Sequence, residues 1–317
     1  ILQAGFIPVF VDIERETLNI DPLKIEEKIT EKTKAIMPVH LMGKPADMDK
    51  INKIARKYNL YVIEDSAEAQ SAVYKGKNIG TLGDMAAFSL YIAHIISTIE
   101  GGIVTTNNSD FAEILRSLRA HGRACKCETC VLNIGSQYCS KRFKPVRRNT
   151  IEGGYDTDIR FIFERIGYSA KMNELEAAIG LGYLEIYPEI FNKRKKNFLY
   201  IREKFKKFKP YLVTINPEPY EEMAPYAFPI ILQENVRFTR DEFVSYLEKN
   251  GTDTRSLFLS MPTQCPGFKF LNYKLGDFPE AEYVGNNGLH IGIHQDITKE
   301  HIDYFIDLVE KFFNQRI

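Results

Sequence analysis

In the first part of the chain, short β-rich apolar runs alternate with segments in which apolar residues have helical spacing. Short β-rich runs are expected to form strands at 8–13 ("PVFVDI"), 35–41 ("AIMPVHL") and 61–65 ("YVIED"). Between them, helical spacing of apolar residues predicts helices at 21–29 and 47–59, the second with Met48, Ile51 and Ile54 on one face. This alternation of strand and helix favours a parallel, doubly wound sheet with helices on both sides.

The middle of the chain continues this pattern and then loses it. "AAFSLY" and "GIVTTN" predict two more strands, and "SDFAEILRSLRAHG" predicts a helix that ends at Gly122. Residues 124–154 form a Cys-, Lys- and Arg-rich loop, whose length is typical of a functional or disordered segment. Helical spacing returns at "MNELEAAIGLGYLEIY", and we expect Pro188 to interrupt this helix. The basic helix that follows is expected to be a solvated connector.

The last part of the chain predicts a smaller α+β unit. "YAFPIIL" is typical of a strand, Thr239 and Glu242 form a capping box for the next helix, and a final amphipathic helix carries Ile302, Phe305, Ile306 and Val309. We therefore expect an α/β protein with a large domain at 1–190 and a connector helix with a smaller domain at 191–317.

Composition excludes several classes of partner. The 317 residues contain 42 basic and 42 acidic side chains, so no global field favours nucleic acid or a membrane surface. No apolar run is long enough to span a bilayer, and the start does not read as a signal peptide. Five cysteines, four of them between Cys125 and Cys139, do not resemble a secreted disulfide framework. We expect a cytoplasmic protein.

Candidate chemistry gathers where predicted strands end. Ligands of open α/β sheets bind beyond the carboxyl ends of the strands. Asp65 ends one predicted strand between Glu64 and Glu68, while Ser89 and His94 lie at or just past the end of another. An acid, a hydroxyl and an imidazole at one rim form a plausible catalytic group. On spacing alone, His94 is also consistent with a hydrogen-bonded core histidine, and Asp65 with a helix cap.

The chain resembles the sugar-nucleotide aminotransferase family, which has the aspartate-aminotransferase fold of type I pyridoxal-phosphate enzymes. The resemblance rests on "VIEDSAEAQSAVYKGKNIGTLGDMAAFSLYIAHIISTIEGGIVTTN" and on stretches in the same order nearly end to end, among them "KAIMPVHLMGKPADMDKI", "IGYSAKMNELEAAIGLGYLE" and "GLHIGIHQDITKEHIDYF". It implies that the family segment before "GFIPVF", with a phosphate anchor and a ring that stacks on the pyridine, is absent. A chain that begins at Ile1 is then expected to retain its cofactor poorly.

The resemblance implies four cofactor-binding residues. Asp65 matches the acid that pairs with the pyridine nitrogen and keeps it protonated, so that the ring acts as an electron sink. Glu68 matches the polar residue beside the ring hydroxyl, and Ser89 matches a phosphate-binding hydroxyl. Ser169 stands where many relatives have an Asn that reaches the phosphate of the neighbouring subunit, which implies a homodimer.

His94 stands where the aminotransferases have their Schiff-base lysine. Imidazole cannot form that imine, but it is a general base near neutral pH. The same exchange is found in a sub-branch, the nucleotide-linked 4-keto-6-deoxyhexose 3-dehydratases, which hold pyridoxamine phosphate without a covalent link. There the histidine takes a proton from the cofactor's methylene carbon, and the sugar loses the hydroxyl next to its ketone.

The cysteine-rich loop resembles a segment of the CDP-sugar 3-dehydratases that bind a 2Fe–2S cluster. Cys125, Cys127 and Cys139 align with three cluster ligands, the fourth position falls on Ala67, and Cys130 is an additional cysteine nearby. One interpretation is four free thiols. The other is a metal centre, iron–sulfur or zinc, in which Cys130 replaces the lost ligand. A cluster implies an electron-transfer reductase as partner.

The sequence therefore predicts a 3-dehydratase that depends on pyridoxamine or pyridoxal phosphate and acts on a nucleotide-linked 4-keto-6-deoxy sugar for lipopolysaccharide or other surface glycans. Two alternatives stay open: a sugar aminotransferase relative that uses His94 differently, and a non-catalytic homologue. The nucleotide, the sugar and the fate of the product are not determined by these residues.

Overall fold

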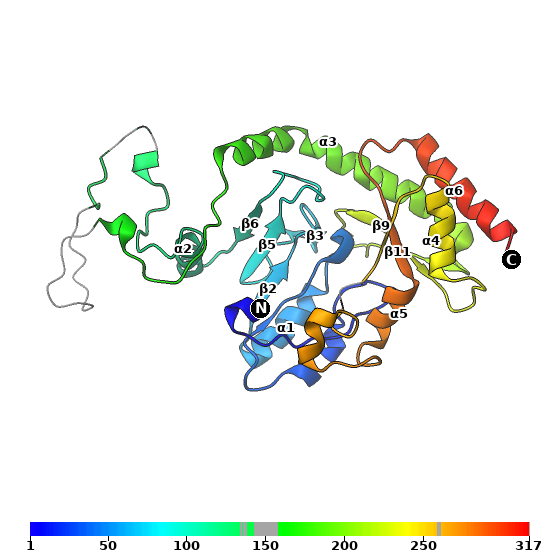
Figure 1. The fold of residues 1–317 in the computed structure, drawn as a ribbon, viewed down its shortest axis with the longest axis horizontal. Coiled ribbons are helices and arrows are strands. Elements are labelled where there is room, and N and C mark those ends of the chain that lie inside the picture. The colour runs from blue at the N-terminus through cyan, green and yellow to red at the C-terminus, as the bar shows by residue number, and fades with distance from the viewer. Residues whose placement is uncertain (134, 136–137, 143–157, 259–260, 317) are drawn as a thin grey trace. The chain divides into compact units, whose positions relative to one another are not determined.

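The computed structural model describes residues 1–133, 135, 138–142, 158–258 and 261–316. They belong to two compact units, one made of Ile1–Val104 and Ala178–Ile317 and the other of Thr105–Ala177 (Figure 1). The predicted domain boundary at residue 190 falls inside a helix of the first unit and stays a prediction. Much of the second half of the cysteine-rich loop, at 143–157, lies outside the described residues.

The parallel sheet of the first unit carries the predicted strand ends. Its four strands are arranged β1-β2-β5-β6, and both β1–β2 and β2–β5 pair in parallel. The elements are β1 (Ala35–Ile36), α1 (Met48–Tyr58), β2 (Tyr61–Asp65), β5 (Met85–Ser89) and β6 (Gly102–Thr105). Asp47 caps α1, whose Met48, Ile51 and Ile54 are buried as their spacing predicts. The α/β prediction for this part is confirmed.

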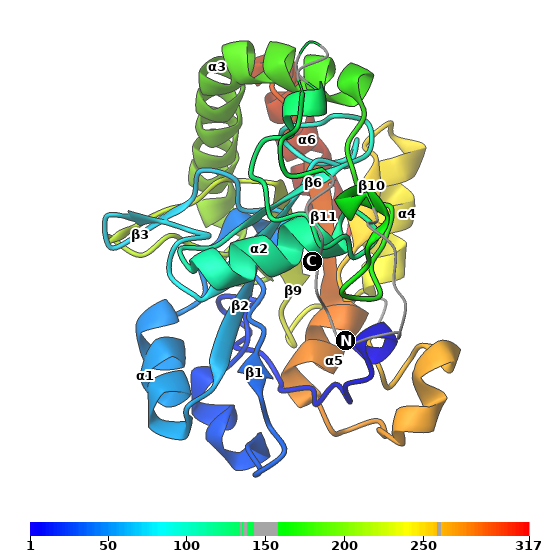
Figure 2. The same cartoon turned by 90° about the vertical axis from the view of Figure 1, so that its left-hand side faces the viewer.

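A second sheet, entirely antiparallel, forms the predicted C-terminal α+β part. Its strand order is β10-β11-β9-β7, with α4 and α6 in contact and α4 also against β11 (Figure 2). The elements are β7 (Leu212–Val213), β9 (Ala227–Leu232), α4 (Arg240–Lys249), β10 (Thr254–Ser256), α5 (Pro279–Asn287), β11 (Gly288–Gly292) and α6 (Lys299–Asn314). The Thr239–Glu242 capping box is present.

Short elements complete the first unit. β3 (Val73–Tyr74) pairs antiparallel with β4 (Lys77–Asn78) and with β8 (Glu221–Glu222). Its 3₁₀ turns are Leu2–Ala4, Pro22–Lys24, Glu26–Lys28, Leu41–Gly43, Lys206–Phe208 and Pro266–Leu271. The second unit contains α2 (Ser109–Leu118) and the 3₁₀ turns Val131–Asn133 and Ile159–Phe161. α2 ends at Leu118, four residues before the helix end predicted at Gly122.

Two other local predictions are wrong. The predicted strand at 8–13 is extended chain, in which only Ile13 forms a bridge, to Ile20. The predicted helix at 21–29 consists of two 3₁₀ turns, the first capped by Asp21. Both segments have the expected apolar residues, but a strand also needs a partner, and a helix this short gains little from propagation.

The predicted strand at 35–41 is shorter than expected. Only Ala35–Ile36 pairs as a strand, and Val39 bridges to Asp65. Pro38, between them, has no N–H to donate to the ladder.

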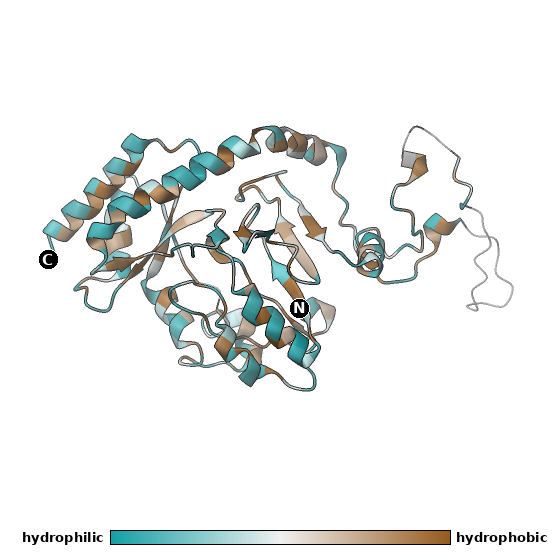
Figure 3. Ribbon diagram, turned by 180° about the vertical axis from the view of Figure 1, so that it is seen from behind, coloured by the Kyte–Doolittle hydropathy of each residue, from teal (hydrophilic) through white to brown (hydrophobic). Residues whose placement is uncertain are grey.

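The long helix α3 (Glu174–Phe205) corrects two predictions. It continues through Pro188 rather than ending there. It is also no solvated connector, because Phe198, Ile201 and Phe205 are at most 3% exposed in the core beneath the C-terminal sheet. Most of its basic residues are at least partly exposed, and Arg194 is the buried exception, donating hydrogen bonds to the carbonyl groups of Pro225 and Tyr226. Figure 3 shows hydrophilic residues along its C-terminal half and hydrophobic ones along its N-terminal half.

Among the described residues, no helix combines the length and the apolar character needed to cross a membrane.

Candidate active site

Asp65 and Ser89 end neighbouring parallel strands. Asp65 pairs with Ala87 in the register between β2 and β5, so Ser89 lies two residues further along the adjacent strand. The Oδ1 atom of Asp65 accepts a hydrogen bond from the Ala67 N–H at 3.1 Å, as in a strand-end turn. Within the described residues, no hydrogen bond engages its Oδ2 atom. That oxygen is available to a cationic or N–H partner.

Glu64, next to Asp65, has a structural role. Its fully buried carboxylate accepts hydrogen bonds from the backbone N–H groups of Gly80, Leu82 and Gly83 at 2.6–2.9 Å. It also contacts the Nε2 atom of His40 at 3.1 Å. The Nδ1 atom of His40 accepts from the Ala46 N–H, which leaves Nε2 as the donor to Glu64. Burial opposes the charge, but these hydrogen bonds outweigh it and lower the pKa of Glu64.

Glu68 is the perturbed acid of the site. Its Oε2 atom accepts a hydrogen bond of 2.7 Å from the Met42 N–H. Burial, reinforced by the nearby charge of Asp65, raises the pKa of Glu68 to about 7 despite that hydrogen bond. A carboxyl group that titrates near neutral pH can donate or accept a hydrogen bond, which suits a position beside a ring hydroxyl.

His94 lies in the loop after β5, half-buried, with its ring between two tyrosines. The ring centroids of His94 and Tyr226 are 5.4 Å apart, and those of His94 and Tyr91 are 6.4 Å apart. Its Nδ1 atom is buried and has no hydrogen-bond partner among the described residues. Burial lowers the pKa of His94, and the charge of Asp65 acts in the opposite direction. The imidazole is therefore a neutral base at neutral pH, not a satisfied core histidine.

The remaining polar groups fit a pyridoxal-type cofactor. The Ser89 hydroxyl accepts a hydrogen bond from the Tyr91 N–H, and its own hydrogen remains for an anion. Gln70 donates to the Ser89 carbonyl, while its Oε1 atom, like the hydroxyl of Ser66, is buried without a partner in the described residues. Unsatisfied buried groups beside an acid and a neutral imidazole are typical of a binding site.

Tyr226, a neighbour of His94, and His290, a neighbour of Tyr226, were not predicted from the sequence. Tyr226 precedes β9 and contacts both His94 and, at 6.5 Å between centroids, His290 of β11. The pKa of Tyr226 is raised by burial and by Glu68. A histidine in the middle of an otherwise apolar strand, "GLHIG", was the available signal for His290.

Ser169 belongs to the second unit, so the fold of the first unit does not by itself bring it to the other four predicted residues. It forms an isolated antiparallel bridge with Ala120. Its predicted role toward a neighbouring subunit stays a prediction.

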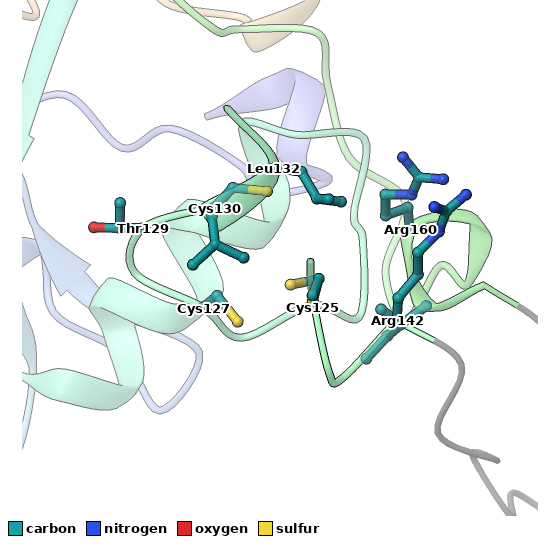
Figure 4. Close-up of a pocket in the computed structure, with 10 residues that line it drawn as sticks. Cys125, Cys127, Thr129, Cys130, Leu132, Arg142 and Arg160 are labelled. Carbon is teal, nitrogen blue, oxygen red and sulfur yellow. The ribbon is translucent and has the colours of Figure 1, made fainter. Parts of the chain in front are cut away.

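The four cysteines of the second unit line one small pocket of about 40 Å³ (Figure 4). Arg142 and Arg160 line it too, and both pair with Asp158 at 2.5–2.6 Å. Burial and a hydrogen bond with Cys125 raise the pKa of Cys127. In the part of the chain that the structure describes, no group of three or more His, Cys, Asp or Glu side chains has the spacing of a metal site.

Comparison with known proteins identifies the family of the chain. Residues 1–310 match the DegT/DnrJ/EryC1/StrS aminotransferase family. The chain belongs to this family. The type I fold predicted from the motifs is thereby confirmed, and the chain is placed among pyridoxal-phosphate enzymes that act on nucleotide-linked sugars.

Individual relatives differ in activity. The chain is 36% identical over 315 residues to the lipopolysaccharide biosynthesis protein RfbH of Salmonella typhimurium, covering 98% of this chain and 70% of RfbH. It is similar to the structure of an Escherichia coli GDP-4-keto-6-deoxy-D-mannose-3-dehydratase with bound hydrated PLP (29% identity, TM-score 0.75, 94% of this chain and 73% of that one). It is also similar to an aminotransferase from Psychrobacter cryohalolentis (27% identity, TM-score 0.81, 99% and 77%).

Proposed function

We propose that this chain is a pyridoxamine-phosphate-dependent 3-dehydratase of a nucleotide-linked 4-keto-6-deoxyhexose, active in the cytoplasm in the synthesis of surface glycans. The observation that carries the proposal is His94, a half-buried imidazole whose buried Nδ1 has no partner among the described residues and which the resemblance puts at the position of the family's lysine. Among the described residues, the groups that contact or act on its ring are Tyr91, Tyr226 and Asp65, and none of them is an amine.

The residues divide the chemistry between them. The bound cofactor supplies the amine and the electron-withdrawing ring. The free oxygen of Asp65 would hold the ring nitrogen protonated, Glu68 would hydrogen-bond the ring hydroxyl, and Ser89 would donate to the phosphate. His94 would serve as the base that accepts a proton from the cofactor and returns it to the departing sugar hydroxyl. The loss of that hydroxyl as water makes the reaction a dehydration.

Borohydride reduction and product analysis test this proposal together. The protein is mixed with pyridoxal phosphate, reduced and digested, and no peptide should carry the cofactor. With pyridoxamine phosphate and a nucleotide-linked 4-keto-6-deoxyhexose, mass spectrometry should show a product that has lost the 3-hydroxyl. His94→Asn should abolish that product, whereas His294→Asn, at an exposed histidine, should not. A labelled lysine peptide together with an amino-sugar product would support the aminotransferase alternative instead.

The cysteine pocket does not fit the cluster ligands implied by the resemblance. Ala67 has no donor atom, and it lies in the first unit while the four cysteines lie in the second. No step of the proposed reaction therefore runs through an iron–sulfur cluster.

A local metal centre is a separate proposal, which the shared pocket supports. Cys125, Cys127, Cys130 and Cys139 come from 15 consecutive residues and line one cavity together with Arg142 and Arg160. Their side chains must draw together around the metal, which would also hold them deprotonated.

Metal analysis after anaerobic purification tests this second proposal. Zinc without sulfide would indicate a mononuclear site, and iron with sulfide would indicate a cluster and hence a reductase partner. Cys130→Ser should lower the metal content, whereas Cys265→Ser, outside the pocket, should not. A parent protein without metal would contradict the proposal.

A further inference from the structure

His290 lies on the central part of the antiparallel sheet and faces away from its core. On β11, Leu289 and Ile291 are at most 5% exposed within the C-terminal core, so His290 points to the other face of the strand. Its register partners are Pro229 on β9 and Arg255 on β10. Packing alone does not require a histidine at this central position, because an apolar side chain would fill it and would need no hydrogen-bond partner.

The ring of Tyr226 lies near both His290 and His94. The centroid of Tyr226 is 6.5 Å from that of His290 and 5.4 Å from that of His94. The Nδ1 atoms of both histidines are buried, and neither has a hydrogen-bond partner in the described residues. An unsatisfied buried nitrogen costs about 1–3 kcal/mol, so two of them around one tyrosine indicate partners that the chain itself does not provide.

The face of β11 that carries His290 is open at Gly292. Gly292 lies two residues further along this face and is exposed, and a Cβ atom added there would meet no atom within 4 Å. The side chain of Arg255, across the strand pair, is 65% exposed. This face therefore has room for a polar ligand.

The chemistry of His290 suits a sugar hydroxyl. Burial, together with the positive charge of Arg255, lowers the pKa of His290 to about 4, and Asp253 opposes this only weakly. The ring is therefore neutral at pH 7, with one N–H donor and one acceptor nitrogen. A hydroxyl group also donates and accepts, whereas a phosphate only accepts and would prefer a cation.

We propose that His290 is a specificity-determining residue, whose imidazole hydrogen-bonds a hydroxyl group of the hexose of the substrate on the far side of Tyr226 from His94. The identity of the ligand as a nucleotide-linked sugar rests on the proposed function. The contact itself rests on the unpartnered ring nitrogen and the open face beside it.

Calorimetric titration distinguishes the contribution of the hexose to binding from that of the nucleoside diphosphate. The full chain loaded with pyridoxal phosphate, which has no amine to condense with the sugar ketone, is titrated with a nucleotide-linked 4-keto-6-deoxyhexose and, separately, with the matching nucleoside diphosphate. His290→Leu should weaken binding of the sugar nucleotide by about tenfold, the loss of one hydrogen bond, and leave the nucleoside diphosphate unchanged. His290→Gln, which keeps a donor and an acceptor, should restore most of the affinity. His294→Asn is the matched control.

The outcomes are distinct. Unchanged sugar-nucleotide affinity in His290→Leu, or equal weakening of both ligands, would overturn the inference. So would failure of His290→Gln to bind better than His290→Leu. Because binding is measured without turnover, a wild-type protein that binds the sugar nucleotide through His290 but releases no dehydrated product would contradict the proposed function and leave this inference standing.

Discussion

At the scale of single residues, the site is defined by Asp65 and by two titratable groups, His94 and Glu68, whose surroundings move their pKa values. Burial lowers the pKa of His94 and raises that of Glu68 to about 7, while Asp65 keeps one carboxylate oxygen free. His94 should therefore remain a neutral base below its ordinary pKa of 6.5. We expect the acid limb of the profile of kcat/KM against pH to fall at a pH below 6.5, and a limb well above that value would contradict the role of burial.

Glu68 gives a second prediction, on stability. Its folded pKa lies above its unfolded value, so the folded state binds the extra proton, and stability falls as the pH rises from about 4.5 to about 7. Glu68→Gln removes this penalty, which amounts to at most about 3 kcal/mol. The free energy of unfolding of the variant, relative to wild type, should rise across this window and level off above pH 7. A difference that does not vary with pH would contradict the raised pKa.

At the scale of elements, close backbone contacts hold the turn Leu41–Gly43 against the segment before β9. Gly43 has φ = +77°, and a Cβ atom there would lie 1.7 Å from the Ala224 carbonyl oxygen. The same turn presents the Met42 N–H to Glu68, and the Met42 carbonyl accepts from the Tyr226 N–H. The turn therefore positions both Glu68 and Tyr226.

A matched pair of glycine variants tests this contact. Gly76 has nearly the same φ, +76°, but a Cβ atom there meets nothing within 4 Å. Gly76→Ala should cost about 1–2 kcal/mol of unfolding free energy through backbone strain alone. Gly43→Ala should cost at least about 3 kcal/mol more and weaken cofactor binding, because the turn must move away from Ala224. Equal losses in chemical denaturation would show that the close approach is unimportant.

At the scale of the whole molecule, the prediction is a two-fold homodimer. The N-terminal half of α3 exposes Leu181, Leu184 and Ile186 by 66%, 56% and 52%, and a monomer rarely leaves several large apolar side chains of one helical segment in water (Figure 3). We expect a dimer in sedimentation equilibrium, and Leu184→Glu should shift it toward monomer. Leu275→Glu, at a side chain that is 74% exposed elsewhere, is the control. A stable, active monomeric wild type would refute the prediction.

The sequence by itself determined the features that depend on residues close together along the chain. The helix of Met48–Tyr58, the strand of Tyr61–Asp65 and the capping box at Thr239 follow from spacing and caps, which act over a few residues. The motif resemblance alone indicates the fold and the group of Asp65, Glu68, Ser89 and His94. Their proximity follows because parallel neighbouring strands bring their carboxyl ends to one edge.

Only the tertiary structure decided what depends on partners distant in the sequence. The segment at 8–13 has strand residues but no neighbour to pair with, and the polar helix after Pro188 hides a buried face against the C-terminal core. Glu64 and Glu68 look alike in "VIEDSAE", yet four hydrogen bonds stabilise the charge of one, while burial beside Asp65 disfavours the charge of the other. Burial and hydrogen bonding depend on the residues that surround a side chain in the folded protein. His290 and Tyr226 lie close together because β9 and β11 pair.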